Sequence, residues 1–279
     1  MNAPISMAAP VQDGLPALWD PQMPIGAMLA GKRGLVVGVA NDHSIAYGCA
    51  ARLRALGADL ALTYLNAKAE PHVRPLAERL GADLCLPLDV EEPGALERVF
   101  ETIAARWGSL DFVIHSIAFA PREDLHGRVM DCSAQGFAQA MHVSVYSFLA
   151  MARLAEPLLN PGASLITMTY YGADKVVGHY NVMGPVKAAL EASTRYLAAE
   201  LGEKGVRVHA VSPGPLRTRA ASGIADFDSL TTMAQTRSPA HRLVDIAEIG
   251  NLVAFLVGAG ASGMTGDTIY VDAGLHNMA

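Results

Sequence analysis

Apolar residues along the chain fall into two alternating kinds of segment. Short aliphatic and β-branched runs are typical of strands buried on both faces of a parallel sheet. They are found at 34–39, 59–64, 83–88, 112–116, 164–169, 206–211 and 268–272. Longer stretches with helical spacing lie between them, at 44–57, 70–80, 93–107, 134–158, 180–203 and 245–258. The alternation predicts one α/β domain with a Rossmann fold, in which a seven-stranded parallel sheet is doubly wound with helices on both faces.

The ends of the chain and one long connection stand outside this pattern. Residues 1–28 are rich in proline and hold no basic residue, unlike a signal peptide, so we expect a flexible extension before a Rossmann-type domain at 29–279. No run of 18 apolar residues occurs, which predicts no membrane span. The segment 213–240 follows a strand at the expected ligand edge, and we interpret it as a substrate-binding lid rather than a plain surface loop.

The charge balance narrows the class of partner. Acidic residues outnumber basic ones by 27 to 21, and no run of Lys or Arg occurs, which argues against a nucleic-acid partner. We expect a small-molecule or thioester substrate instead. Cys49, Cys85 and Cys132 are widely spaced, so neither a disulfide nor a metal site is predicted, and a reducing, cytoplasmic location is favoured.

In a doubly wound sheet the ligand crevice lies at the carboxyl ends of the strands. The first strand leads into Gly38, which can form a tight turn, and Ser44 can cap the next helix, whose amides would face a pyrophosphate. The second and third glycines of a dinucleotide-binding motif are absent, so an ordinary strand-to-helix turn is an equal alternative.

The segments after the next three strands carry the other cofactor candidates. No acid near Leu65 is placed for a ribose 2′-hydroxyl and no Arg stands beside it for a 2′-phosphate, so the choice between NADH and NADPH stays open. Asp89 can accept from an adenine amino group or simply precede a helix. Small residues after His115 let a cofactor ribose approach the backbone, and His115 itself is interpreted as structural.

The fifth strand ends at Tyr170, and two further polar residues follow it. Tyr180 and Lys187 are seven residues apart, which on a helix places both on one face with a rise of about 10.5 Å. They could then converge on one ligand. In the alternative interpretation Tyr180 packs at the start of a helix and Lys187 extends along the surface.

Four segments resemble the bacterial NADH-dependent enoyl-acyl-carrier-protein reductases, a divergent branch of the short-chain dehydrogenases. They are Gly38 to Gly48, His115 to Ala120, Tyr180 to Lys187 and Ser212 to Thr218. The likeness covers roughly 31–274, and the Tyr-x6-Lys spacing is its most specific part. It implies a homotetramer that reduces a carrier-protein-bound enoyl substrate in fatty-acid elongation.

The resemblance also implies roles for individual residues. Tyr180 would meet the thioester carbonyl, Lys187 would bind the nicotinamide ribose, and Tyr170 matches the other active-site tyrosine. The implied cofactor contacts are Gly38, Ser44, Ile45, Leu65, Asp89, Val90, Ser116, Ile117, Ala118, Lys187, Pro213, Leu216 and Thr218. The implied substrate contacts are Ala118, Tyr170, Tyr180 and Ala220. Leu65 and Tyr171 depart from the family, which affects the cofactor preference and the acyl pocket.

Two alternatives accompany this hypothesis. Tyr171 and Lys175 have the Tyr-x3-Lys spacing of ordinary short-chain dehydrogenases, but they follow the fifth strand directly, so we assign them to a loop. The other candidate functions are a short-chain carbonyl or alcohol dehydrogenase and a nucleotide sensor without activity. Arg217 and Arg219 are candidate contacts for the carrier protein or plain surface charges.

Overall fold

The computed structural model describes residues 28–218 and 226–278. Its strands form one sheet in the order β3-β2-β1-β4-β5-β6-β7, and every neighbouring pair is parallel. The strands are β1 Arg33–Val37, β2 Asp59–Tyr64, β3 Leu84–Pro87, β4 Leu110–His115, β5 Leu159–Met168, β6 Arg207–Pro213 and β7 Thr268–Val271. The predicted seven-stranded parallel sheet is therefore confirmed. The predicted extension at 1–28 lies, apart from Met28, outside the described residues.

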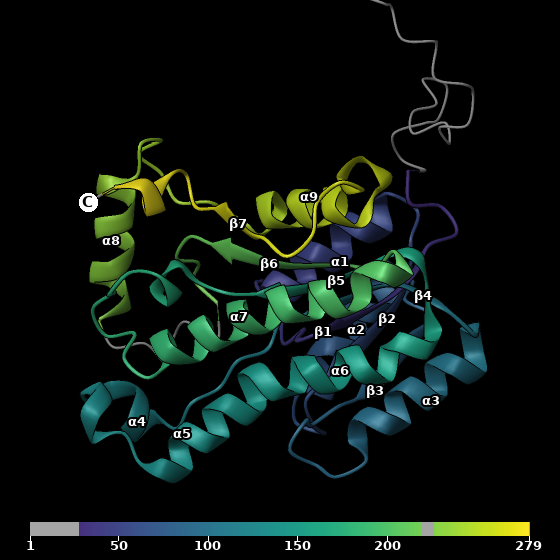
Figure 1. Cartoon of the computed structure of the whole chain (residues 1–279), viewed down its shortest axis with the longest axis horizontal. Coiled ribbons are helices and arrows are strands. Elements are labelled where there is room, and N and C mark those ends of the chain that lie inside the picture. Colours follow the sequence, from purple (N-terminus) through teal and green to yellow (C-terminus); the bar gives the residue numbers. More distant parts are fainter. Residues whose placement is uncertain (1–27, 219–225, 279) are drawn as a thin grey trace, which may run out of the picture.

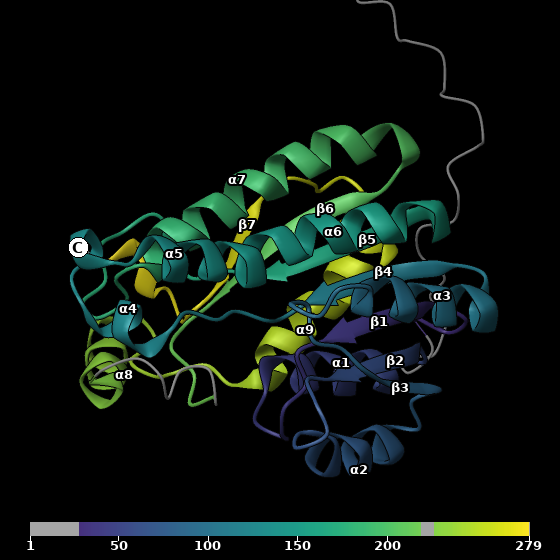
Figure 2. The same ribbon diagram turned by 90° about the horizontal axis from the view of Figure 1, so that it is seen from below.

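Helices cover both faces of the sheet. They are α1 Ile45–Ala55, α2 Glu70–Leu80, α3 Ala95–Trp107, α4 Arg122–His126, α5 Ala134–Met141, α6 Ser147–Ala155, α7 Met183–Leu201, α8 Phe227–Arg237 and α9 Ile246–Val257. Helices α3, α6 and α7 lie in front of the sheet in Figure 1, and Figure 2 shows α7 and α2 on opposite sides of the molecule. The doubly wound arrangement agrees with the prediction.

Each face of the sheet has its own apolar core. Alternate residues of one strand point to opposite faces, so Phe112 packs with α1, α2 and α9, whereas Val113 packs with α3, α5, α6 and α7. Full burial of a side chain as large as Phe112 contributes about 1.5–3 kcal/mol. Among the described residues, no helix has the length and apolar composition needed to cross a bilayer.

Glycines let α1 and α9 approach each other closely. A Cβ on Gly48 would lie 2.4 Å from the carbonyl oxygen of Ile246, and one on Gly250 would lie 2.5 Å from that of Gly48. No side chain fits between the two helices at this crossing, because real Cβ atoms do not approach that closely. The contact holds α1 firmly on the sheet, with its first turn at the carboxyl edge of β1.

The long helix predicted at 134–158 is interrupted. A π-helical turn, His142–Tyr146, separates α5 from α6, and a short 3-10 turn at Glu156–Leu158, which contains Pro157, ends the stretch. In the π-helical turn the Ser144 hydroxyl accepts from the amide of Phe119 (3.1 Å), and it lies 3.3 Å from the Phe119 carbonyl. The interruption ties this stretch to the loop after β4, as π-helical turns at functional sites often do.

Two helices that the sequence pattern did not predict, α4 and α8, stand at the end of the molecule toward which the strands point (Figure 1). Because α4 has only five residues and α8 is rich in Thr and Ser, neither has a clear apolar stripe. Part of the predicted lid at 213–240 is thus the regular helix α8, which stands over the carboxyl ends of the strands.

Candidate active site

The ends of β1 and β4 form the switch point of the sheet, because the chain winds in opposite directions on either side of this pair. Gly38 has a φ of +111°, and a Cβ there would lie 2.1 Å from the carbonyl oxygen of Ser116. The Ser116 amide donates to the Val37 carbonyl (3.0 Å). Gly38 is therefore needed for the close approach of the two strand ends, beside which a ligand crevice opens in such folds.

Ser44 precedes α1, but it does not cap the helix as predicted. Its hydroxyl accepts from the amides of Ala40 (3.0 Å) and Asn41 (2.9 Å), and it donates to the Asn41 carbonyl (2.7 Å). Both lone pairs are occupied by the preceding loop, so none is left for an amide of α1. The first turn of α1, which begins at Ile45, consequently has no side-chain cap.

Leu65 and Asp89 come together as expected from their places after β2 and β3. Both line a cavity of 360 Å³ at the edge of the sheet. The Asp89 carboxylate accepts from the amide of Glu91 (3.0 Å) and so stabilises the turn before α3. Val90, the next residue, is half-buried, and its carbonyl oxygen lies 3.3 Å from the ring of His142.

The residues after β4 divide into a buried histidine and a partly accessible loop. His115 is fully buried between the hydroxyls of Thr167 and Ser147, each 2.8 Å from one ring nitrogen. Burial, with the charge of Lys187 as a smaller cause, lowers the pKa of His115 to about 3. The ring is thus neutral and structural, as interpreted from the sequence. The next three residues are half-buried and lie along the edge: Ser116, Ile117 and Ala118.

Tyr170, which follows β5, lies against the rings of two other tyrosines. The ring of Tyr170 lies 4.9 Å from that of Tyr180 and 4.8 Å from that of Tyr171, both in edge-on contacts. Tyr170 and Tyr180 are 9% and 7% exposed, and burial raises the pKa of both phenols. Both hydroxyls are therefore protonated near neutral pH. The buried Tyr170 hydroxyl has no hydrogen-bond partner in the described part of the chain.

The prediction that Tyr180 lies on the same helix as Lys187 is wrong. Helix α7 begins at Met183, and Tyr180 lies in the turn before it. His179 and Asn181, on either side, have φ values of +63° and +42°, which no α-helix accommodates. The Asn181 side chain donates to the Leu125 carbonyl at the end of α4 (2.7 Å), and this contact holds the turn in place.

Lys187 lies within α7 and is 5% exposed. Its ammonium group donates to the carbonyl of Met168, the last residue of β5 (2.7 Å). One turn along α7, the Glu191 carboxylate accepts from the hydroxyl of Thr169 (2.7 Å). Burial lowers the pKa of Lys187 to about 8, and the charge of Glu191 opposes this shift. Two consecutive residues at the end of β5 thus fix α7, and an ammonium group has three donors, of which this bond uses one.

The competing pair Tyr171 and Lys175 does not lie together on a helix. Tyr171 begins the 3-10 turn Tyr171–Ala173, and Lys175 is exposed in an ion pair with Asp174 (2.9 Å). Their assignment to a loop agrees with the structure, and their side chains are not brought to a common face of α7.

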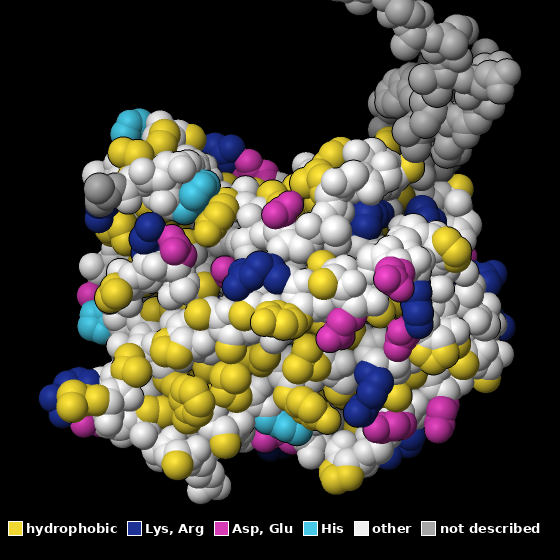
Figure 3. Space-filling view, viewed as in Figure 1, with side chains coloured by type: hydrophobic (Ala, Val, Ile, Leu, Met, Phe, Trp, Pro, Cys, Tyr) yellow, Lys and Arg dark blue, Asp and Glu magenta, His cyan; other side chains and the backbone are white. Residues whose placement is uncertain are grey.

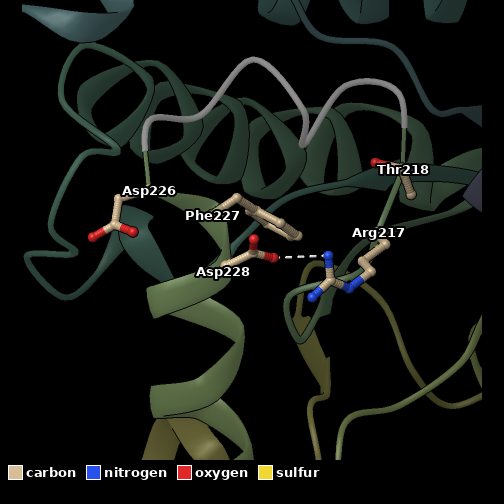
Figure 4. A pocket seen from close by; sticks show the side chains of 5 residues that line it. All are labelled: Arg217, Thr218, Asp226, Phe227 and Asp228. Carbon is tan, nitrogen blue, oxygen red and sulfur yellow. Dashed lines mark ion pairs between the residues drawn. The ribbon is translucent and has the colours of Figure 1, made fainter.

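The chain leaves β6 at Pro213, and Leu216 and Thr218 follow, both half-buried. Arg217 pairs with Asp228 of α8 (2.8 Å), and Figure 4 shows these two side chains pointing toward each other beside Phe227. They line a cavity of 440 Å³ together with Thr218 and Asp226. Arg217 is thus partnered by α8, while Ala220 and Arg219 lie outside the described residues.

A doubly wound parallel sheet with a buried tyrosine and lysine at its carboxyl edge is typical of Rossmann-type oxidoreductases that use a nicotinamide dinucleotide. Residues 38–276 match the family model described as enoyl-(acyl carrier protein) reductase, and the chain belongs to this family. The family that the sequence motifs indicated is therefore confirmed.

Individual relatives agree over nearly the whole length. The chain is 46% identical to an NADH enoyl-acyl-carrier-protein reductase of Rhizobium meliloti, over 90% of this chain and 92% of the relative. It is 44% identical to the solved reductase of Anaplasma phagocytophilum in complex with NAD, with a TM-score of 0.86 over 91% of this chain and 95% of that one. The solved Bacillus cereus reductase with NADP+ and indole naphthyridinone is 43% identical, with a TM-score of 0.88 over 90% and 99% of the two chains.

Proposed function

We propose that the chain reduces the carbon–carbon double bond of a trans-2-enoyl thioester on an acyl carrier protein, with hydride from NADH. The observation that carries this proposal is a buried, protonated Tyr180 hydroxyl at the carboxyl edge of the sheet, on the edge where the ammonium group of Lys187 is fixed to the end of β5. NADH as cofactor and an enoyl-acyl-carrier-protein substrate agree with the names of the relatives.

The residues at the switch point suit a dinucleotide. The first turn of α1 has no side-chain cap, so its amides are left for an anion such as a pyrophosphate. The crossing at Gly38 brings backbone to the place where a cofactor would lie, and the cavity beside Leu65 and Asp89 can take an adenosine. When bound, NADH would supply a hydride, which carries the electron pair of the reduction, and a proton added at the α-carbon then completes it.

Tyr180 stabilises the charge that develops on the substrate. Addition of hydride to the β-carbon places negative charge on the thioester carbonyl oxygen, and the phenol donates a hydrogen bond to it. Because burial raises the pKa of Tyr180, the phenol keeps its proton until that charge appears. One preorganised donor of this kind contributes about 2.7–4 kcal/mol to the transition state.

Lys187 orients the cofactor. The bond from its ammonium group to the Met168 carbonyl fixes the side chain, and the remaining N–H donors would bind the ribose hydroxyls of the cofactor. Its positive charge also favours the developing enolate. Tyr170 packs edge-on against Tyr180, limits the motion of that ring and offers a second buried hydroxyl toward the substrate.

We further propose that the protein acts as a homotetramer in the cytoplasm. Figure 3 shows hydrophobic side chains gathered over the face formed by α5, α6 and α7. Phe137 of α5, Tyr146 of the π-helical turn between α5 and α6, and Tyr196 of α7 are 42%, 47% and 74% exposed, and an apolar face of this kind favours burial against another copy. Light scattering after gel filtration tests the assembly, and a monomer at micromolar concentration would contradict it.

The activity is tested by the loss of NADH absorbance with crotonyl or longer trans-2-enoyl thioesters. Tyr180→Phe should lower kcat by about 10²–10³-fold, the usual effect of removing one donor to an oxyanion. Tyr196→Phe, which removes only a hydroxyl from a side chain of α7 and keeps its apolar ring for the proposed contact between copies, is the control and should leave the rate unchanged. Oxidation of NADH with a ketone and not with the enoyl thioester would favour a carbonyl dehydrogenase. Binding of NADH without turnover would favour a nucleotide sensor.

A further inference from the structure

The cavity between the ends of β2 and β3 is lined by charged side chains that the sequence around Leu65 did not indicate. It has a volume of 360 Å³. Its neutral lining comes from the loop after β2, the end of β3 and the start of α3: Leu65, Asn66, Ala67, Pro87 and Ala95. The charged side chains in the lining are Asp89, Glu92 and Arg98. Arg98 thus shares a cavity with Leu65, although no Arg stands near Leu65 in the sequence.

Two neighbouring groups hold the side chain of Arg98 in place. Its guanidinium group forms an ion pair with the Glu92 carboxylate and donates to the Pro93 carbonyl (3.4 Å). The side chains of Arg98 and Glu92 are 57% and 61% exposed, so both can be reached by a ligand in the cavity. Asp89 adds a second carboxylate, which the Glu91 amide keeps in place.

These three side chains leave the cavity with a formal charge of −1, from two carboxylates and one guanidinium group. In Rossmann folds the adenosine ribose lies next to the end of the second strand, and an Arg there accommodates the 2′-phosphate of NADP. A 2′-phosphate carries a charge of about −1.5 to −2, whereas the 2′-hydroxyl of NAD is neutral. The cavity therefore repels the first group and tolerates the second.

We propose that the Glu92–Arg98 ion pair sets the cofactor preference, because Glu92 neutralises the guanidinium group that lines this cavity and could otherwise bind a 2′-phosphate. The proposal rests on the proposed function, and it makes Glu92 the residue that excludes NADPH. Cofactor choice is open within the family, because one solved relative holds NAD and another holds NADP+. Glu92 and Arg98 then distinguish NADH from NADPH, which the apolar side chain of Leu65 cannot do.

The test is Glu92→Gln, which keeps the shape of the side chain and frees Arg98. We expect kcat/KM with NADPH to rise about tenfold while kcat/KM with NADH stays nearly unchanged, the size expected for one unit charge acting on a doubly charged group in water. Glu91→Gln is the matched control. It removes the same charge one residue away, from a side chain that is bonded to Gln139 and does not line the cavity. The double variant Glu92→Gln/Arg98→Gln should lose the gain.

A binding measurement separates this proposal from the proposed function. Calorimetry with adenosine 2′,5′-bisphosphate and with 5′-AMP needs no turnover, and Glu92→Gln should tighten the bisphosphate alone by about tenfold. An unchanged bisphosphate affinity would overturn the proposal, and so would an equal gain in Glu91→Gln or a gain that persists without Arg98. A parent protein that oxidises neither cofactor with an enoyl thioester would instead refute the proposed function, whatever the bisphosphate shows.

Discussion

A substitution at Gly172 can shift the ring of Tyr180 while leaving the hydroxyls of Tyr170 and Tyr180 chemically unchanged. A Cβ at Gly172 would lie 2.5 Å from Cδ1 and 2.9 Å from Cε1 of Tyr180, and 3.3 Å from Cδ1 of Tyr170. Carbon atoms in contact are about 3.5–4.0 Å apart, so Gly172→Ala must displace the Tyr180 ring by about 1 Å. Gly172 lies in the turn Tyr171–Ala173, whose φ is not positive, so alanine adds no backbone strain there.

Two effects of different size follow from this displacement. Overpacking of this kind costs about 1–3 kcal/mol of unfolding free energy, which leaves the domain folded. A shift of about 1 Å at a reacting group costs about 10²-fold in rate. We therefore expect Gly172→Ala to lower kcat with an enoyl thioester by about two orders of magnitude and to leave the KM for NADH unchanged.

Gly178→Ala is the matched control, because it lies in the same connection and a Cβ there meets nothing within 4 Å. Both variants and the parent are compared by NADH oxidation and by thermal unfolding. Equal kcat values for Gly172→Ala and Gly178→Ala would refute the reasoning. A loss of NADH binding in Gly172→Ala would show that the glycine acts on the cofactor rather than on Tyr180.

Three further predictions follow from buried groups that can carry a charge. Because the pKa of Lys187 is lowered to about 8, activity should fall as the pH rises through 8. The free energy of unfolding should instead rise between pH 8 and 10.5, because in this range only the unfolded chain holds the proton. Lys187→Met should abolish this rise in stability. Arg207→Lys should cost about 1–3 kcal/mol in denaturant unfolding, because the shorter side chain leaves unsatisfied some of the buried carbonyls at and after the end of α9 that the guanidinium group now binds. Burial lowers the pKa values of His115 and His209 to about 3 and about 4. The free energy of unfolding should therefore fall as the pH drops below 6.5, by up to about 1.4 kcal/mol per pH unit for each ring. His209→Leu should make this fall less steep.

The fold could be predicted from the sequence because of how parallel sheets are buried. Each strand contacts helices on both faces, so its apolar residues form an unbroken run that is easily recognised, as in the segment around Ile114. Residues that follow such runs directly could then be assigned to the carboxyl edge, and Gly38, Leu65, Asp89 and Tyr170 do lie there. Helix α8 was missed because its sequence has no apolar stripe of its own.

Errors arose where a tertiary contact decides the local structure. Ser44 has the position of a helix cap, but the loop before it takes up both lone pairs of its hydroxyl. Arg98 is far from Leu65 along the chain, and the packing of α3 against β3 brings it to the same cavity. Neither interaction has a sequence pattern, because both depend on which backbone atoms or helices become neighbours after folding.

The seven-residue separation of Tyr180 and Lys187 does not arise from a single helix. Since α7 begins only at Met183, the separation combines a turn with the first turn of a helix. The turn is fixed by the left-handed residues His179 and Asn181 and by the bond from Asn181 to Leu125, so the place of the phenol depends on α4 as well as on α7. Lys187, in contrast, is placed by β5 through Met168. The two groups thus belong to separate parts of the scaffold: the turn and α4 place the phenol, and β5 places the ammonium group.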